Sequence, residues 1–248
     1  MMKIGIIGGS GLDDPDILEH PSDLEFDTPY GAPNSTLRQG RIGGKDVVLL
    51  ARHGRAHTAT PSHVNYRANI HALKAVGCAA VISTTAVGSL RQEIHRGDLV
   101  ILDQFIDFTK RRVSTFYDRF EPHNPAHTPM ADPFSEPLRE LCVAACRKLG
   151  HRFHERGTVV TIEGPRFSTR AESNMFRQFG ADVINMSVAT ECALAAEADL
   201  PYAAIAMSTD YDCWKTDEPP VSWEEIVAIF KENAEKVTSV LIEVIGAM

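Results

Sequence analysis

The chain carries two carboxylic acids one residue apart, directly after an apolar segment. Asp210 and Asp212 stand in the run Ser-Thr-Asp-Tyr-Asp-Cys-Trp, which follows the predicted strand Tyr202–Met207. Each buried carboxylate needs a hydrogen-bond donor, because burial without one is costly. An aminopurine would supply one, since its exocyclic amine donates and its N7 accepts from a protonated acid. A hard metal ion held by both acids, a pair of helix caps and two solvated carboxylates are the alternatives.

Groups that bind oxyanions follow three other apolar segments. They are Gly8-Gly9-Ser10-Gly11 after Ile4–Ile7, Arg52-His53 after Val47–Ala51, and Thr84-Thr85-Ala86 after Ala79–Ser83. Glycines let backbone N–H groups approach an anion, arginine offers a bidentate fork, and hydroxyls add further donors. The glycine spacing matches neither the dinucleotide fingerprint nor the phosphate loop of Mg-nucleotide enzymes. Each segment alone could be a turn or a strand end, but together they favour a site for a small anion.

A fourth segment pairs a soft side chain with polar ones. Asn185, Met186 and Ser187 end a predicted strand over Val183–Met186, and Glu191 follows shortly after. A methionine could cover one face of a sugar ring while backbone and hydroxyl groups hold the sugar oxygens. A core methionine and a helix cap would explain the same residues equally well if they stood alone.

Short apolar strands alternate with helical patterns along the chain. The predicted strands are Ile4–Ile7, Val47–Ala51, Ala79–Ser83, Leu99–Ile106, Thr158–Ile162, Val183–Met186 and Tyr202–Met207. Several are near-continuous Val, Ile and Leu runs, which are typical of strands covered on both faces. Open α/β sheets bind ligands at the carboxyl ends of their strands, which is where the segments described above lie.

Boundary signals predict the helices between these strands. They are a helix over Asn65–Val76 closed by Gly77, a helix after Ser135 stopped by Gly150, a helix opened by the capping box Thr169–Glu172, and a long C-terminal helix opened by the capping box Ser222–Glu225. Two segments, Lys110–Pro133 and Lys215–Val221, fit neither element and are predicted to be lids, interface arms or disordered loops. The alternation favours a single α/β domain over residues 1–248.

Composition and charge exclude several classes of protein. The chain has 248 residues and is 44% hydrophobic and 23% charged, as expected for a globular domain. Its formal net charge of -8 does not provide the basic footprint of a nucleic-acid binder. No apolar run is long enough to span a bilayer, so neither nucleic acid nor membrane is an expected partner. The five cysteines are scattered without a Cys-x-x-Cys pair, which disfavours a zinc site or a disulfide framework and indicates a reduced, cytoplasmic protein.

Five segments together closely resemble one family. They are Gly5–Leu12, Leu50–Arg55, Val64–Asn69, Thr161–Ser168 and Thr209–Trp214. They resemble the 5′-methylthioadenosine phosphorylases of the purine nucleoside phosphorylase superfamily, and the similarity extends from Gly5 into the C-terminal helix. Relatives that act on 6-oxopurines differ in the last segment. The resemblance implies one α/β domain with a central mixed, partly barrel-like sheet flanked by helices, assembled as a trimer or a dimer of trimers.

The resemblance also implies a reaction and a set of site residues. Inorganic phosphate, as co-substrate, would convert methylthioadenosine into adenine and methylthioribose 1-phosphate without metal or cofactor, in purine and methionine salvage. Phosphate would be held by Ser10, Arg52, His53, Thr85, Ala86 and Ser187. The nucleoside would be contacted by Phe167 at the base, Met186 at the ribose, Asp210 and Asp212 at the purine edge, and His127, Trp223, Ile226 and Val227 at the methylthio group. His127 would act across the subunit boundary, and the predicted catalytic residues are Asp210, Asp212 and His53.

Four features depart from the family pattern. Ser10 and Ser187 stand where close relatives often have threonine, which keeps the hydroxyl. Trp223 replaces a smaller aliphatic residue and leaves the preferred 5′ substituent open. The residues before Glu191 also lack an expected proline.

In the mechanism that we expect, the C1′–N9 bond breaks early and Asp210, in its protonated form, donates to N7. Asp212 accepts from the exocyclic amine, and phosphate attacks the opposite face of C1′. The alternatives are a broader 6-aminopurine nucleoside phosphorylase acting on adenosine or 5′-deoxyadenosine, a hydrolase of the same superfamily, and a non-enzymatic purine-binding protein. A phosphatase using a phosphohistidine at His53 and a metal hydrolase using the two acids are further rivals.

Overall fold

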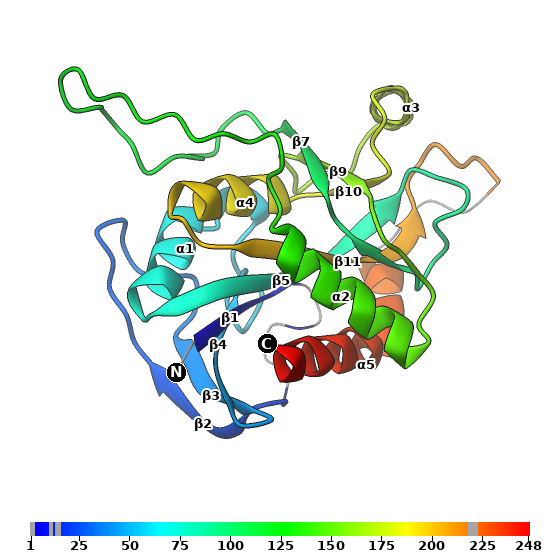
Figure 1. The fold of residues 1–248 in the computed structure, drawn as a ribbon. Helices are drawn as coiled ribbons and strands as arrows, with labels where there is room; N and C mark the ends of the chain where they lie inside the picture. Colours follow the sequence, from blue (N-terminus) through cyan, green and yellow to red (C-terminus); the bar gives the residue numbers. More distant parts are fainter. Residues whose placement is uncertain (1–2, 10–11, 13–15, 218–222) are drawn as a thin grey trace.

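The fold is known from a computed structural model that describes residues 3–9, 12, 16–217 and 223–248; within 223–232 only Ile229 has a described side chain. Figure 1 shows its helices and strands. The strands are β1 (Lys3–Gly8), β2 (Glu19–Leu24), β3 (Leu37–Ile42), β4 (Lys45–Ala51), β5 (Cys78–Ser89), β6 (Leu99–Ile101), β7 (Gln104–Phe108), β8 (Phe153–His154), β9 (Thr158–Ile162), β10 (Val183–Asn185) and β11 (Tyr202–Tyr211). The helices are η1 (Pro61–His63), α1 (Tyr66–Ala75), α2 (Glu136–Leu149), α3 (Arg170–Gln178), α4 (Val188–Glu197) and α5 (Trp223–Ala247).

The strands of the described residues form one mixed sheet that branches at its longest strand. The main path runs β2-β3-β4-β1-β5-β10-β9-β7. Strand β5 pairs in parallel with both β1 and β11, and its last residues pair antiparallel with β10. Because one strand serves three neighbours, the sheet bends around β5 and the ends of β1, β4, β10 and β11 converge. The mixed sheet flanked by helices confirms the predicted fold class.

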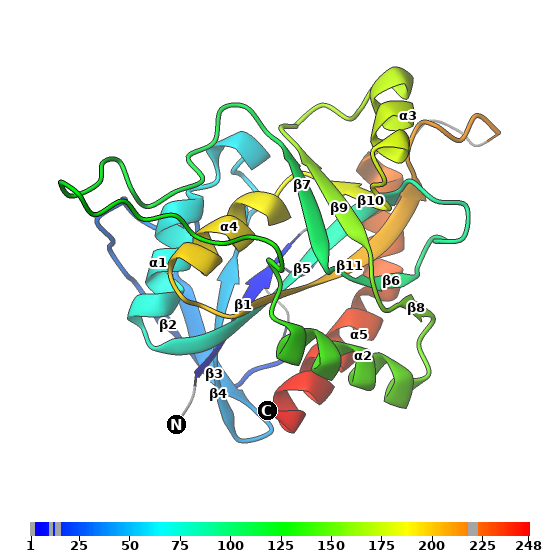
Figure 2. The same ribbon diagram turned by 45° about the horizontal axis from the view of Figure 1, so that its top comes forward.

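Helices cover both faces of the central strands, as the apolar runs predict. Ile4 and Ile6 of β1 pack in a cluster with α2 and α5, whereas Ile7 packs in a second cluster with α1 and α4. Figure 2 shows these two helix pairs on opposite sides of β1 and β5. Strand β4 divides in the same way, since Val47 and Leu49 join the first cluster and Val48 and Leu50 join the second. Alternating burial on two faces therefore explains why these strands are apolar throughout.

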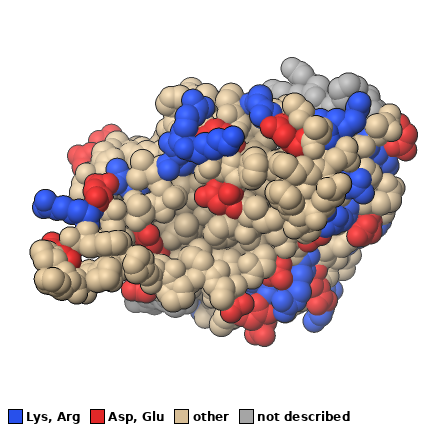
Figure 3. Space-filling view, turned by 90° about the horizontal axis from the view of Figure 1, so that it is seen from above, with Lys and Arg blue, Asp and Glu red and all other residues tan. Residues whose placement is uncertain are grey.

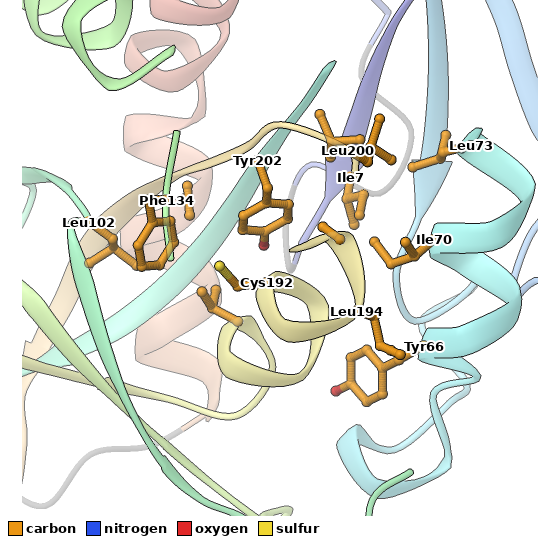
Figure 4. Packing of buried hydrophobic residues seen from close by; sticks show 14 of the residues in the cluster. Ile7, Tyr66, Ile70, Leu73, Leu102, Phe134, Cys192, Leu194, Leu200 and Tyr202 are labelled. Atoms are coloured by element: carbon orange, nitrogen blue, oxygen red, sulfur yellow. The ribbon is translucent and has the colours of Figure 1, made fainter. Parts of the chain in front are cut away.

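The core on the α1–α4 side packs directly beneath the strand ends. Figure 4 shows Ile7 facing Ile70 and Leu73 of α1, and Leu194 of α4 beside Tyr66. These five side chains are at most 3% exposed. This packing holds α1 and α4 against the strands that carry the polar segments.

Several predicted strand boundaries are wrong. The predicted strand over Leu99–Ile106 is two strands, β6 and β7, because the chain changes partner between β11 and β9 at Leu102-Asp103. There the Asp103 carboxylate accepts a hydrogen bond from the Gly157 N–H at 3.0 Å. Strands β5 and β11 continue beyond their predicted ends, so Thr85 and Asp210 lie inside strands. Strand β10 ends one residue early. Strands β2 and β3 are mostly polar and β8 has only two residues, so no apolar pattern predicts these three strands.

The helix predictions mostly hold. Asn65 caps α1, Gly150 closes α2 with a φ of 68°, and the Thr169–Glu172 capping box opens α3. The predicted capping residue Ser222 lies outside the described residues. Helix α4 has no prediction because it is buried nearly all round and shows no amphipathic period. No helix of the described part of the chain has the length and apolar character to cross a membrane.

Residues 110–133, here called the arm, leave the sheet after β7. Figures 1 and 2 show the arm extending away from the body of the molecule, over α1 and α4. It contains no helix or strand, and all of its residues are described. Val113, Tyr117 and Phe120 are 50%, 43% and 45% exposed on it.

Candidate active site

A pocket of about 320 Å³ gathers most of the predicted site residues. It lies where β4, β5, β10 and β11 converge. Nine of the predicted residues line it: Arg52, His53, Thr85, Ala86, Phe167, Met186, Ser187, Asp210 and Asp212. Ser10 lies outside the described residues, as do the side chains of Trp223, Ile226 and Val227. His127 is on the arm, where its ring packs 5.5 Å from that of Phe120, and it does not line the described pocket of its own chain.

An irregularity in β11 places Asp210 in the pocket. Ser208 pairs with Val87 and Asp210 with Gly88, so β11 has one residue more than β5 between these pairs. Such a bulge changes the direction of the side chains that follow it. A Cβ atom on Gly88 would lie 3.1 Å from Asp210 Oδ2, so the absence of a side chain there makes room for the acid. Asp210 is 8% exposed, and its Oδ1 accepts a hydrogen bond from Thr209 Oγ1 at 2.7 Å.

Two residues further along, Asp212 is held by Ser168, which has no role among the sequence predictions. Ser168 Oγ lies 3.0 and 2.7 Å from the two carboxylate oxygens of Asp212 and donates to one of them. The Asp212 backbone N–H donates to Ser89 O at 3.0 Å. Phe167, beside Ser168, is 45% exposed at the mouth of the pocket. The two acids therefore line one end of the pocket, next to an aromatic ring that could cover a planar base.

The pocket wall also carries a positive charge, the guanidinium of Arg52, which forms a buried ion pair with Glu191. Arg52 and Glu191 are 1% and 0% exposed. Arg52 Nε donates to Glu191 Oε1, and Nη2 donates to Glu191 Oε2 at 3.0 Å. Burial by itself would lower the pKa of the guanidinium, but the charge and hydrogen bonds of Glu191 outweigh it and hold that pKa above its usual value. Arg52 is thus a permanent cation at the wall of the pocket.

Most of the Arg52 donors are already used within the protein. Nη1 donates to Thr84 O at 3.0 Å, and Nη2 donates to Ser83 Oγ at 2.6 Å. With the two bonds to Glu191, four of the five guanidinium N–H groups have partners among the described residues. The fifth is on Nη1, which lies against Gly9: a Cβ there would be 2.5 Å from Nη1 and 2.6 Å from Thr84 O.

Helix α4 begins at the same wall. Ser187 is its N-cap residue, and its side chain makes no capping hydrogen bond. The positive end of the helix dipole and the first N–H groups favour an anion at this point. Ser187 therefore occupies the N-cap position of α4, as one alternative predicted, but its hydroxyl does not cap the helix.

The orientation of His53 follows from one hydrogen bond. Its Nδ1 lies 2.8 Å from Ala59 O, and because a carbonyl only accepts, Nδ1 carries a proton. Its ring packs on that of His57, with centroids 4.5 Å apart. Nε2 is therefore the nitrogen that can gain or lose a proton.

The sequence predictions assign no role in the site to four residues that shape it. Glu191 and Ser168 hold Arg52 and Asp212, while Tyr66 and Arg112 lie behind the pocket wall. All except Arg112 lie in or next to the quoted motifs, which was the available signal. Among the described residues, no three His, Cys, Asp or Glu side chains gather in a way that could hold a metal ion.

Comparison with known proteins identifies the family. The family model of the phosphorylase superfamily matches residues 3–246. S-methyl-5′-thioadenosine phosphorylase of Danio rerio is 56% identical over 247 residues, which cover 98% of this chain and 88% of the relative. The protein of the same name from Thermofilum pendens is 52% identical, covering 100% of this chain and 92% of the relative.

The solved structures agree with the sequence relatives. Methylthioadenosine phosphorylase from Schistosoma mansoni in complex with adenine superposes with a TM-score of 0.94 at 40% identity, covering 100% of this chain and 92% of the other. A mutant of the Schistosoma mansoni adenosine/methylthioadenosine phosphorylase in complex with methylthioadenosine gives a TM-score of 0.93 at 39% identity, covering 100% and 91%. Because the family model and the relatives match almost the whole chain, this protein belongs to the phosphorylase superfamily.

Proposed function

We propose that the protein cleaves 5′-methylthioadenosine with inorganic phosphate, giving adenine and 5-methylthioribose 1-phosphate for purine and methionine salvage. One observation carries the proposal: a single pocket is lined by two buried acids and by a buried arginine beside a helix N-terminus. The two groups lie apart along β5, because Asp210 pairs with Gly88 whereas Arg52 donates to Ser83 and Thr84. The first group suits an aminopurine and the second suits phosphate. The activity named for the relatives agrees with this division.

At the base end, Asp210 and Asp212 divide the work of recognition and catalysis. Asp210, in its protonated form, donates to N7 as the C1′–N9 bond breaks and negative charge develops on the base. Asp212, oriented by Ser168, accepts from the exocyclic amine. A 6-oxo group would instead place an acceptor against this carboxylate, and such a mismatch in a buried site is strongly selective. Phe167 covers the base.

At the other end, phosphate is oriented for attack on C1′. The donors are the remaining Nη1 hydrogen of Arg52, the Ser187 hydroxyl and the N–H groups at the start of α4 other than that of Ala189, which donates to Thr161 Oγ1 at 3.1 Å. The Thr85 hydroxyl, which donates to Ala86 O at 3.1 Å, joins them by rotating toward the phosphate. His53 Nε2 exchanges a proton with a phosphate oxygen. Met186 covers the ribose, and the bound anion stabilises the cationic sugar carbon electrostatically. Holding both reactants in one pocket makes the attack effectively unimolecular.

The arm is the proposed subunit contact. Its exposed apolar side chains, Val113, Tyr117 and Phe120, project beyond the body of one chain. Figure 3 shows the molecule from above, with a broad area of mostly uncharged side chains and both acidic and basic side chains around its edge. A trimer, or a dimer of trimers, would cover these side chains and bring His127 to the methylthio end of a neighbouring pocket. The five cysteines are free thiols, which suits a cytoplasmic enzyme.

The proposed reaction and its substrate preference are tested by measuring adenine or hypoxanthine release with and without phosphate. Methylthioadenosine, 5′-deoxyadenosine, adenosine and methylthioinosine are compared, and phosphorus NMR identifies the sugar 1-phosphate. We expect phosphate-dependent release from the 6-amino substrates, with methylthioadenosine preferred, and little from methylthioinosine. Equal release without phosphate would identify a hydrolase, and binding without cleavage would identify a purine-binding protein. A broader 6-aminopurine phosphorylase would cleave adenosine as fast as methylthioadenosine.

The subunit contact is tested by sedimentation. Phe120→Asp is expected to dissociate the oligomer and lower activity at low protein concentration. Phe179→Asp makes the same change at a residue that is 56% exposed at the end of α3, and it should leave the oligomer intact. A wild-type protein that sediments as a monomer would refute the assembly without affecting the reaction.

A further inference from the structure

A cluster of three polar side chains lies behind the pocket wall, where the arm leaves the sheet. It consists of Arg112 at the start of the arm, Tyr66 at the start of α1, and Glu163 just after β9. The Arg112 side chain is 1% exposed and Tyr66 is 3% exposed. None of the three lines the described pocket, so the mechanism above does not use them.

Arg112 donates hydrogen bonds to the backbone of the pocket wall and to Tyr66, from the side of the wall that faces away from the pocket. Nη2 donates to Ile162 O at 3.3 Å and to Glu163 O at 2.8 Å, and Nε lies 3.4 Å from Glu163 Oε1. Nη1 donates to Tyr66 OH at 3.0 Å, with the guanidinium 5.2 Å from the centre of the tyrosine ring. One planar group thus joins the end of β9 to the start of α1.

Tyr66 extends these contacts to two further parts of the wall. Its hydroxyl lies 3.0 Å from Pro61 O and 3.4 Å from Met186 O, and it donates to one of them. Pro61, Ile162 and Met186 all line the pocket. The Tyr66 and Arg112 side chains therefore contact three wall residues at their backbone carbonyls, so the side chains of those residues remain available to a ligand.

Glu163 ties the same wall to the arm. Its Oε2 accepts from the backbone N–H groups of Lys110 and Arg111 at 2.7 and 3.0 Å, and its Oε1 accepts from Ser62 Oγ at 2.8 Å. Burial raises the pKa of this carboxyl, but these hydrogen bonds and Arg112 outweigh it and lower the pKa to about 2. The carboxylate is thus charged. Its Oε2 contacts the start of the arm, and its Oε1 contacts Ser62, the neighbour of the wall residue Pro61.

We propose that Arg112 and Tyr66 are positioning residues for the nucleoside half of the pocket, and that Glu163 couples this wall to the arm. This inference rests on the proposed function. The carbonyls that they contact belong to residues beside the proposed ribose and base positions, whereas Arg52 at the phosphate end is held by Glu191, Ser83 and Thr84. Loss of the cluster should therefore weaken nucleoside binding selectively.

Other contacts of the arm allow a control. Arg67 of α1 pairs with Asp118 at 3.1 Å, and Glu197 of α4 accepts from the Phe116 N–H at 2.7 Å. These contacts hold the arm further along and touch no residue of the pocket wall. A variant that acts only through the placement of the arm would behave like one that loses the Arg67 pair.

The test compares Tyr66→Phe and Arg112→Lys with Tyr30→Phe, at a ring whose centre lies 4.8 Å from the Arg67 guanidinium, and with Arg67→Met. We expect the KM for methylthioadenosine to rise about tenfold in the first two variants, which is the effect of roughly one lost hydrogen bond. The KM for phosphate should stay within about twofold in all four variants, and both KM values should stay within that range in the last two. If Tyr66→Phe does not fold, Arg112→Lys provides the same comparison.

Calorimetric binding of methylthioadenosine without phosphate separates the two proposals. If the wild type neither binds the nucleoside in the calorimeter nor releases adenine from it when phosphate is present, the proposed function fails, and this inference fails with it. If the wild type binds and the Tyr66 and Arg112 variants bind equally well, only the positioning role is refuted. Equal increases in both KM values, or an equal effect of Arg67→Met, would also refute it.

Discussion

The ion pair between Arg52 and Glu191 supports a quantitative prediction about stability and activity together. In Glu191→Gln the side chain keeps its shape but loses its charge, and an amide NH₂ replaces one acceptor oxygen. The carboxylate accepts from Arg52 Nε and Nη2, from Ser83 Oγ at 3.1 Å and from Tyr202 OH at 2.7 Å. The amide nitrogen would therefore face donors, and the guanidinium would be buried without a counter-charge.

The size of the effect follows from this arrangement. Removing one partner of a buried pair costs about 3–5 kcal/mol. Because the amide oxygen still accepts, we expect the lower end, a loss of about 3 kcal/mol in the free energy of unfolding. For a chain of this length that corresponds to a melting temperature lower by roughly 6–12 °C. The displaced guanidinium should also raise the KM for phosphate more than the KM for the nucleoside.

A double-mutant cycle measured by urea unfolding at one protein concentration checks the reasoning. In Arg52→Met no guanidinium is left to be orphaned, so Glu191→Gln should cost less in that background. We expect the double variant to be less destabilised than the sum of the single variants by about 2 kcal/mol. Glu243→Gln breaks an exposed pair with Lys148 and should cost less than about 1 kcal/mol. Additive losses in the cycle, or equal losses for Glu191→Gln and Glu243→Gln, would refute it.

Three further predictions concern other parts of the molecule. Asp210→Asn should lower kcat by about 10²–10⁴-fold in the adenine-release assay while leaving the fold intact, whereas Asp46→Asn at the far end of β4 should not; full activity would remove proton donation from the mechanism. Gly88→Ala would place a methyl group 3.1 Å from Asp210 Oδ2, so it should weaken adenine binding measured by calorimetry with little change in phosphate KM. Because the pKa of Glu163 is lowered from 4.5 to about 2, its carboxylate stabilises the fold fully above pH 4.5; the stability lost in Glu163→Gln should shrink as the pH falls toward 2 in acid unfolding curves, and a constant difference would contradict this.

The sequence predicted the central strands because both of their faces are buried. Ile4, Ile6 and Ile7 must all be apolar when helices cover both sides of β1. Where burial is one-sided or absent the signal disappears, as in β2, whose residues are mostly exposed. The ends of β5 and β11 were missed for a related reason. The last residues of both strands are polar because they line a pocket. The loss of the apolar pattern therefore predicted that the strands end, although they continue to Ser89 and Tyr211.

The candidate site could be predicted only as far as residue type reveals chemistry. Asp210, Arg52 and Met186 are marked by what their side chains can do, and the structure brings them into one pocket. How Asp210 comes to face that pocket could not be predicted. It depends on one extra residue in β11 relative to β5, which is a property of pairing between distant strands. The opening for the acid depends on Gly88, whose role is to leave space.

The residues that position the pocket walls could not be predicted from the sequence, for a different reason. Arg112 and Tyr66 act on the carbonyls of Ile162, Pro61 and Met186, and every residue has a carbonyl. Their partners therefore have no distinguishing residue type, and no spacing in the sequence marks the contact. A substrate-binding acid can be inferred from its own chemistry, whereas a positioning residue can be recognised only from what it holds in three dimensions. It follows that a variant library chosen from motifs alone would test the reacting groups and miss the contacts that give the pocket its shape.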